Sequence, residues 1–481
     1  MDKAVDFIKN NKFNILILLV YLFVLVCSIP THELWRDETQ AWCIARDLNI
    51  IDAYNTAKIE GHPMLWYLIL MPFAKLGCDV FIMQIVSALF VFGAVFFLLF
   101  KSQFNNFIKT VFVFSCGMIY YLPVIARNYA LIPLFLFLLA HLYSKRKQHP
   151  VLYSILIIFL ANTHILMLGF ACILTILFLI DLFKEGNKRK FIISFTLLGL
   201  NFIFLFFSFY FVQGLNHAVV NYSQTNTSII ESIQRYAQIF FLQPEKIKID
   251  VFVFYILLIL IFVGLYLENK KMMVLLAGYF FFHFFVYHKV WFNGVPYQKA
   301  FLLLLVIIFC YWIVENKTKI LTYSIGILFL ISTVFSVPTI MLEIKYPYSA
   351  NKEMVEYIKK NLKNEKEIGV ISYPFLISGL SAYLPDKKLY SYINKYYITY
   401  YDFNSKKVKY AQEEPIVNYF VVHSHFDMNE DYELVFKTTD KIINQGEYPE
   451  TFSLYKRKKL WFCHSCRLGI CVSSFFPRNI G

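Results

Sequence analysis

Long apolar runs recur along most of the chain and determine its expected architecture. Each run has about 18 to 22 residues, the length that crosses roughly 30 Å of hydrocarbon as a helix. The pattern predicts eleven spanning helices, at 13–30, 80–100, 107–126, 129–145, 150–168, 168–183, 190–212, 250–268, 272–290, 297–315 and 318–341. One soluble core cannot bury so many apolar helices, so we expect a polytopic α-helical membrane protein.

Basic residues between the runs orient the predicted helices. They concentrate in four short segments, 144–148, 184–190, 268–271 and 315–319, which the positive-inside rule places in the cytoplasm. The N-terminus is then cytoplasmic, and the loops 31–79 and 213–249 are external. The apolar piece 64–77 is short for a span and contains Pro72, so we expect a re-entrant or surface-lying helix there.

The polar pattern changes after the last apolar run. Of the 116 residues from 344 to 459, 33 are charged, against 45 of the remaining 365. Segments 367–373 and 417–426 resemble strands, and 349–363 resembles an amphipathic helix. We therefore predict a transmembrane domain at 1–343, a small extracytoplasmic α/β domain at 344–459 and a poorly ordered tail at 460–481.

Composition agrees with a membrane location and limits the partners. The 481 residues are 58% hydrophobic and 19% aromatic, with a net charge of +14. Because the cations lie in short loops between apolar runs, we expect the lipid bilayer and not nucleic acid as a partner. The first run lacks a small-residue cleavage pattern, so a retained helix is favoured over a signal peptide. The C-x-x-C in the tail has no second pair, which makes it weak evidence for a metal.

Acidic residues at one predicted membrane edge are the first candidates for chemistry. Asp37 and Glu38 stand in "ELWRDETQAWCIARD", directly after the first apolar run. A carboxylate there can take a proton from an acceptor hydroxyl or help to hold a divalent cation. A solvated amphipathic helix on the lipid surface accounts for the same charges without any chemistry.

Cationic and aromatic residues are predicted on the same external side. They are His62, Arg127, Tyr129, His164, Lys289, Tyr297 and Lys299. Cations can neutralise a phosphate, and aromatic faces can stack on a sugar. Simpler roles exist: His164 alone is more often a structural histidine, and lysines at helix ends can snorkel. Together with the carboxylates, these residues suit a lipid-linked phosphate as substrate.

Three motifs in sequence order resemble the GT-C membrane glycosyltransferases, specifically the bacterial relatives of protein O-mannosyltransferases and aminoarabinose transferases. They are "WRDETQAWCIARD", "EGHPMLWYLILMPFAKLG" and "ARNYAL", within roughly the first 170 residues. The resemblance implies a GT-C-like catalytic domain that moves a sugar from a polyprenyl-phosphate-linked donor to an unknown lipid, glycan or protein acceptor. It implies work on the external face of the inner (plasma) membrane and no organic cofactor.

The resemblance assigns roles to the acidic motif. The family's first-loop carboxylates fall on Asp37 and Glu38, with Asp37 the expected base. The acidic residue that some members carry after the "ARNYAL" position is missing, because 130–133 holds no charge. Asp37 is then the only candidate metal ligand. The resemblance does not decide whether the protein binds a divalent cation.

The resemblance also assigns binding residues. The family's "HPP" feature falls on His62 and Pro63, with Met64 in place of the second proline. Its arginine or tyrosine after the fourth helix falls on Arg127 and Tyr129. The roles of the two lysines come from the predicted topology and not from the family pattern.

Two alternatives share the polytopic architecture. A transporter or lipid flippase tends to carry ionisable residues near the bilayer midplane and repeated halves, whereas here the charges lie mainly at one rim and no repeat is evident. A polysaccharide polymerase or ligase would place arginines on a large mid-chain external loop. The loop 213–249 contains only Arg235, Lys246 and Lys248 as cations.

Overall fold

The described part of the chain divides into a helical unit and a sheet unit. The structure is a computed structural model, and it describes residues 2–210, 228–239, 249–290, 297–402, 414–444 and 448–458. The helical unit comprises 1–32, 41–347 and 402–406, and the sheet unit comprises 33–40, 348–401 and 407–481. The predicted loop 213–249 lies mostly, and the tail 460–481 entirely, outside the described residues.

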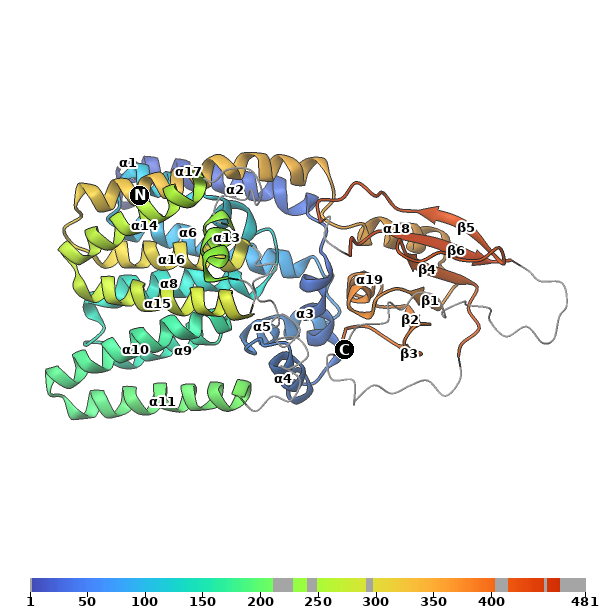
Figure 1. Cartoon of the computed structure of the whole chain (residues 1–481), viewed down its shortest axis with the longest axis horizontal. Coiled ribbons are helices and arrows are strands. Elements are labelled where there is room, and N and C mark those ends of the chain that lie inside the picture. The colour runs from blue at the N-terminus through green and yellow to red at the C-terminus, as the bar shows by residue number, and fades with distance from the viewer. Residues whose placement is uncertain are drawn as a thin grey trace. The chain divides into compact units, whose positions relative to one another are not determined.

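The helical unit is a bundle in which most of the long helices run side by side (Figure 1). Its described helices are α1 (Asp2–Asn10), α2 (Lys12–Ser28), η1 (Ile29–Thr31), α4 (Ile50–Ile59), α5 (Leu65–Lys75), α6 (Ile82–Lys101), α7 (Asn106–Val113), η2 (Gly117–Tyr121), η3 (Asn128–Leu131), α8 (Ile132–Leu142), η4 (Tyr143–Lys145), α9 (Pro150–Ala161), α10 (Ile165–Glu185), α11 (Lys188–Tyr210), α13 (Ile229–Ile239), α14 (Ile249–Glu268), α15 (Lys270–Val290), α16 (Tyr297–Ile313) and α17 (Lys319–Lys345). Neighbours include α6 with α8, α10 with α15, and α14 with α17.

Polar residues between the apolar runs begin and end these helices. The side chain of Asn105 caps α7 by accepting the amide hydrogen of Ile108 at 2.8 Å. Thr318 caps α17 in the same way. Gly186 ends α10 with a φ of +79°, a left-handed conformation that favours glycine. The breaks in the apolar pattern therefore have a local cause in the sequence.

Seven helices in the described ranges are long and apolar enough to cross a membrane. They are Lys12–Thr31, Ile82–Lys101, Ile165–Glu185, Lys188–Tyr210, Val251–Glu268, Lys270–Lys289 and Lys319–Lys345. Their surfaces expose large apolar side chains: Phe23 is 68% exposed, Phe252 70% and Val334 62%. Water disfavours so much exposed apolar surface, whereas lipid tails accept it. These observations agree with the predicted polytopic helical architecture and its small C-terminal α/β domain.

The prediction of eleven spans was too high for the described residues. The run 107–126 forms α7 and the π-helix η2, with a break between them. Pro123, which lacks an amide hydrogen, follows shortly after the end of η2. The runs 129–145, 150–168 and 297–315 form α8, α9 and α16, of 11, 12 and 17 residues. Average hydropathy does not register such interruptions, so it merged short helices into full spans.

The predicted external loop 31–79 contains three helices. They are α3 (Arg36–Asp47), α4 and α5. At 11 residues α5 is too short to span, which agrees with the interpretation of 64–77 as a non-spanning piece. Residues 33–40 belong to the sheet unit. The sequence pattern, which placed the domain boundary at 344, contains no sign of that division.

The sheet unit is built on a mixed six-stranded sheet with the order β3-β2-β1-β4-β6-β5. The strands are β1 (Glu367–Ile371), β2 (Lys388–Ser391), β3 (Tyr396–Tyr397), β4 (Tyr419–His423), β5 (Tyr432–Lys437) and β6 (Phe452–Arg457). β1 pairs in parallel with β2 and β4, and the remaining pairs are antiparallel.

The two faces of the sheet bury different clusters. Val370 and Val421 pack in one core with residues of α18 (Asn351–Asn361) and α19 (Ile377–Tyr383). Ile371 follows Val370 in β1, and Phe420 precedes Val421 in β4. These two residues pack in a second cluster. This alternation follows from the two-residue period of a strand. The sheet is therefore buried on both faces at its centre, and its parallel strands end at one edge.

Candidate active site

Five predicted residues of the helical unit belong to one cluster. The ring centroid of His164 lies 5.9 Å from that of His62 and 4.6 Å from that of Tyr129. The guanidinium carbon of Arg127 lies 6.0 Å from the Tyr129 ring centroid. The charge of Lys299 also acts on His164. We call these five residues the cationic cluster.

Each member comes from a different local feature of the chain. His62 lies in the turn between α4 and α5, where Gly61 adopts a φ of +75°. Arg127 precedes η3 in an extended conformation, and Tyr129 lies within η3. Lys299 lies in the first turn of α16. Breaks between helices thus bring these polar groups together, as is common for functional residues.

His164 begins α10 and is neutral. Its Nδ1 accepts the amide hydrogen of Leu166 at 3.1 Å, so the ring proton is on Nε2. The prediction placed this residue near the end of a helix over 150–168, whereas α9 ends at Ala161 and His164 is the N-cap of the next helix. The residue is 1% exposed. Burial lowers the pKa of His164 well below its usual value, and the nearby charges of the cluster lower it further.

The charges of the cluster favour an anion. The charges of Arg127 and Lys299, which come from separate elements, both lower the pKa of the buried His164. Arg127 also acts on Tyr67, whose hydroxyl donates to Glu60 at 2.8 Å. Arginine and lysine are side chains that commonly bind phosphate groups in proteins.

Two predicted residues are not brought into the cluster by any described contact. Lys289 is exposed in the last turn of α15, and nothing in the described part of the chain joins it to His164 or Arg127. Tyr297 begins α16, and its side chain lies outside the described residues.

Sequence reasoning missed His283, which supports the cluster from α15. Its Nε2 donates to the carbonyl oxygen of Lys299 at 2.9 Å, so its Nδ1 accepts from the Tyr236 hydroxyl at 2.8 Å. His283 is 2% exposed. It fixes the first turn of α16, which carries Lys299. The available signal was the position of this histidine in the middle of the apolar run 272–290.

A second missed network lies where the chain leaves the helical unit. The Nδ1 atom of His32, after η1, lies 2.9 Å from Oε1 of Glu343 in α17, and both side chains are fully buried. Tyr120 of η2 donates its hydroxyl to the other oxygen of Glu343. The chain passes to the sheet unit after residues 32 and 347. This network therefore joins two positions in the helical unit, His32 and Glu343, that lie just before the chain passes to the sheet unit.

The acidic motif lies in the sheet unit, and its two carboxylates have different environments. Glu38 is fully buried, and its Oε2 accepts the amide hydrogen of Trp35 at 3.1 Å. This is the carboxylate half of a capping box at the start of α3. Asp37 is 44% exposed, with an Oδ1 atom 3.8 Å from Nε of Arg36. Glu38 thus shapes the helix start, and Asp37 is the more exposed of the two carboxylates.

Residues far along the sequence hold this motif in place. The amide of Arg36 donates to Oε1 of Glu450 at 3.0 Å, and its Nη1 donates to the carbonyl oxygen of Tyr448 at 3.2 Å. The side chain of Gln40 donates to the carbonyl oxygen of Tyr401 at 2.6 Å and accepts that residue's amide hydrogen at 2.9 Å. The segment 33–40 is therefore an integral part of the sheet unit.

Glu450 is a buried carboxyl whose state depends on pH. Asn351 donates to its second oxygen. Burial raises the pKa of Glu450 to about 7, from an ordinary value of 4.5, although Arg36 and Asn351 favour the charged form. The folded state therefore binds the proton more tightly than the unfolded state. The stability from this group is complete below pH 4.5 and is lost as pH rises through about 7.

We predict that hydrogen exchange at the Arg36 amide speeds up between pH 6 and pH 8. After correction for intrinsic exchange, protection falls about fivefold to tenfold, or roughly 1 kcal/mol, because Glu450 loses its proton while buried. Glu450→Gln removes this pH dependence. Glu433→Gln, an exposed carboxylate on β5, retains it. Equal pH dependence in both variants would contradict the assignment to Glu450.

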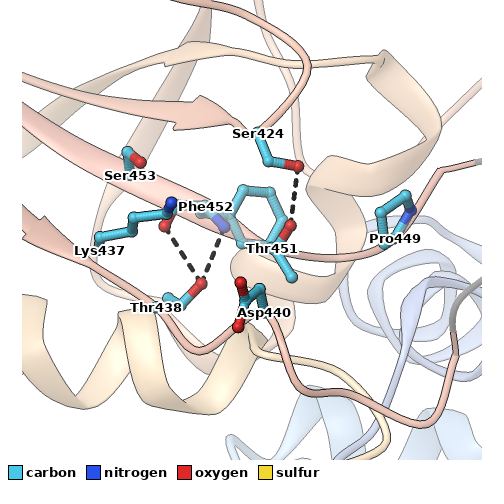
Figure 2. Close-up of a pocket in the computed structure, with 8 residues that line it drawn as sticks. All are labelled: Ser424, Lys437, Thr438, Asp440, Pro449, Thr451, Phe452 and Ser453. Atoms are coloured by element: carbon cyan, nitrogen blue, oxygen red, sulfur yellow. Dashed lines mark hydrogen bonds between the residues drawn. The ribbon is translucent and has the colours of Figure 1, made fainter.

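A hollow of about 200 Å³ lies elsewhere in the sheet unit (Figure 2). It is lined by Ser424, Lys437, Thr438, Asp440, Pro449, Thr451, Phe452 and Ser453. Thr451 donates to the Ser424 hydroxyl at 2.8 Å, and the Phe452 amide donates to Thr438 at 2.9 Å. No residue predicted from the sequence lines this hollow.

Metal ligands do not gather in the described ranges. Within them, no group of three or more His, Cys, Asp or Glu side chains could hold a metal ion. Asp37 stays the only candidate ligand.

No protein-family model matches the chain, and no curated protein matches it. The resemblance to GT-C transferases therefore rests on the three motifs, and the function has to be argued from the site.

Proposed function

We propose that the protein is a membrane glycosyltransferase that moves a sugar from a polyprenyl-phosphate-linked donor to an external acceptor. The observation that carries this proposal is the cationic cluster. The charges of Arg127 and Lys299 act on one buried histidine, in a unit whose long apolar helices suit a bilayer. An anion attached to a membrane-bound lipid matches both features.

The proposed reaction is an inverting displacement. An acceptor hydroxyl attacks the anomeric carbon, the bond from that carbon to the phosphate oxygen breaks, and polyprenyl phosphate leaves with the electron pair. Asp37 takes the hydroxyl proton as general base. Arg127 and Lys299 stabilise the leaving phosphate, and His62, Tyr129 and neutral His164 position the donor. Glu38 has no chemical role in this scheme, because it caps α3.

The location is part of the same proposal. We infer a multi-pass protein of the inner (plasma) membrane with a cytoplasmic N-terminus and an extracytoplasmic sheet unit. The basic loops between apolar runs support this orientation. A protease added to intact spheroplasts should then cleave the sheet unit and spare the loop 144–148.

A glycan comparison tests the proposed function without knowledge of the acceptor. Envelope glycans and lipid-linked sugars are profiled in cells with and without the protein. We expect a sugar to be missing from one glycan, with its polyprenyl-phosphate donor accumulating. An unchanged profile would contradict the proposal and favour transport or a scaffold role.

A further inference from the structure

The sheet changes its direction of winding at β1. From β1 the chain passes through α19 to β2 on one side, and it later reaches β4 on the opposite side of β1. Both neighbours run parallel to β1, so all three strands end at the same edge. In open α/β sheets, ligands bind at such a topological switch point, beside the carboxyl ends of the strands.

Aromatic side chains from three segments meet at this edge. Tyr373 follows β1, His425 follows β4, and Tyr448 precedes β6. The ring centroid of Tyr373 lies 4.7 Å from that of Tyr448 and 6.3 Å from that of His425. Phe375 lies 5.3 Å from Tyr448. Tyr373, Phe375 and Tyr448 are half-buried and His425 is exposed. We call these four residues the switch-point surface.

The segment 33–40 adds a charge pair to this surface. The guanidinium carbon of Arg36 lies 5.0 Å from the ring centroid of Phe375, and its Nη1 donates to the carbonyl oxygen of Tyr448. Asp37 follows directly and is 44% exposed. The carboxylate proposed as the base and the aromatic surface therefore belong to one folded unit.

A neutral histidine and a polar hollow border the surface. The Nε2 of His423 donates to the carbonyl oxygen of Pro449 at 2.8 Å, and its Nδ1 accepts the amide hydrogen of His425 at 3.3 Å. Burial lowers the pKa of His423 to about 4, so the ring is uncharged at neutral pH. Pro449 and Ser424, neighbours of this contact, also line the hydroxyl-rich hollow of Figure 2.

This combination suits a saccharide. Aromatic faces stack on the C–H faces of a sugar ring, while a carboxylate, a guanidinium and hydroxyl groups bond to its hydroxyls. An anionic ligand fits less well, because the exposed carboxylate of Asp37 would repel it. We propose that the switch-point surface binds the saccharide acceptor and places its reacting hydroxyl beside Asp37. This assignment rests on the proposed glycosyl transfer and names the acceptor class for it.

Binding by the full-length protein in lipid nanodiscs tests the proposal. The probe is the mixture of oligosaccharides released from the envelope of cells that lack the protein. We expect Tyr373→Leu and Tyr448→Leu to raise the apparent Kd about tenfold, because each removes a stacking ring. Tyr448 holds Arg36 through its backbone carbonyl, so the side-chain change leaves that contact in place.

Two variants serve as matched controls. Tyr448→Phe retains the ring and should bind within about twofold of the wild type. Tyr357→Leu removes a ring that stacks on Phe436 at 4.2 Å, elsewhere in the same unit, and should also bind normally. Equal binding by all variants, or no saccharide binding by the wild type, would overturn the site.

Donor cleavage by the wild type separates this proposal from the proposed function. Cleavage of polyprenyl-phosphate sugars without saccharide binding overturns the switch-point site alone. Saccharide binding that depends on Tyr373 and Tyr448, with no donor cleavage, contradicts the transferase function and supports the binding site.

Discussion

Asp37→Asn is expected to abolish sugar transfer while the protein stays folded in membranes. The asparagine has nearly the same shape but cannot accept the proton of the acceptor hydroxyl. Loss of a general base costs roughly 10² to 10⁴ in rate, so we expect transfer to fall about a thousandfold. The measurement is transfer of labelled sugar from a polyprenyl-phosphate donor in membranes that contain equal amounts of each variant.

Asp47→Asn is the matched control for this substitution. Asp47 ends the same helix and pairs with Arg46 at 2.6 Å, so the change removes a partly exposed carboxylate without altering the proposed base. It should transfer sugar at the wild-type rate. Full activity of Asp37→Asn would remove Asp37 from the mechanism, whatever the function of the cationic cluster.

Arg127→Ala is expected to have the second large effect on the rate of sugar transfer. The guanidinium carbon lies 6.0 Å from the Tyr129 ring centroid, and the proposed mechanism uses this cation to stabilise charge on the leaving phosphate. Loss of one such group costs about 10² to 10³ in rate, so we expect kcat to fall by at least a hundredfold. Arg127→Lys keeps the charge but loses the planar fork, and should recover part of the activity.

The variant Arg189→Ala controls for a general loss of positive charge. Arg189 is exposed in the first turn of α11 and is not part of the cationic cluster. Its substitution should leave kcat unchanged. If Arg127→Ala and Arg189→Ala were equally active, the cationic cluster would not bind the donor phosphate.

The membrane class and part of the candidate site could be predicted from the sequence. Hydropathy identified the long helices, and the motifs singled out His62, Arg127, Tyr129 and His164, which ring and cation contacts join. Short breaks between helices were missed. The stretch from 162 to 164 separates α9 from α10, but it is flanked by apolar residues that average hydropathy counts as one run.

The placement of the acidic motif could not be predicted, because its partners are distant. Arg36 and Glu450 are 414 residues apart, and no periodic pattern links them. The capping role of Glu38 could not be predicted from the sequence either. A capping box is recognised by Ser or Thr three residues before the carboxylate, and here Trp35 occupies that position.

Donor cleavage by the purified protein tests the central claim most directly. Wild-type protein in nanodiscs is incubated with polyprenyl-phosphate-linked sugars extracted from cells that lack it, together with the envelope oligosaccharides of those cells. We predict release of polyprenyl phosphate and growth of an oligosaccharide by one sugar, both lost in Asp37→Asn and Arg127→Ala. Donor lipids that stay intact, while the same protein in vesicles moves them across the bilayer, would contradict the transferase and identify a flippase.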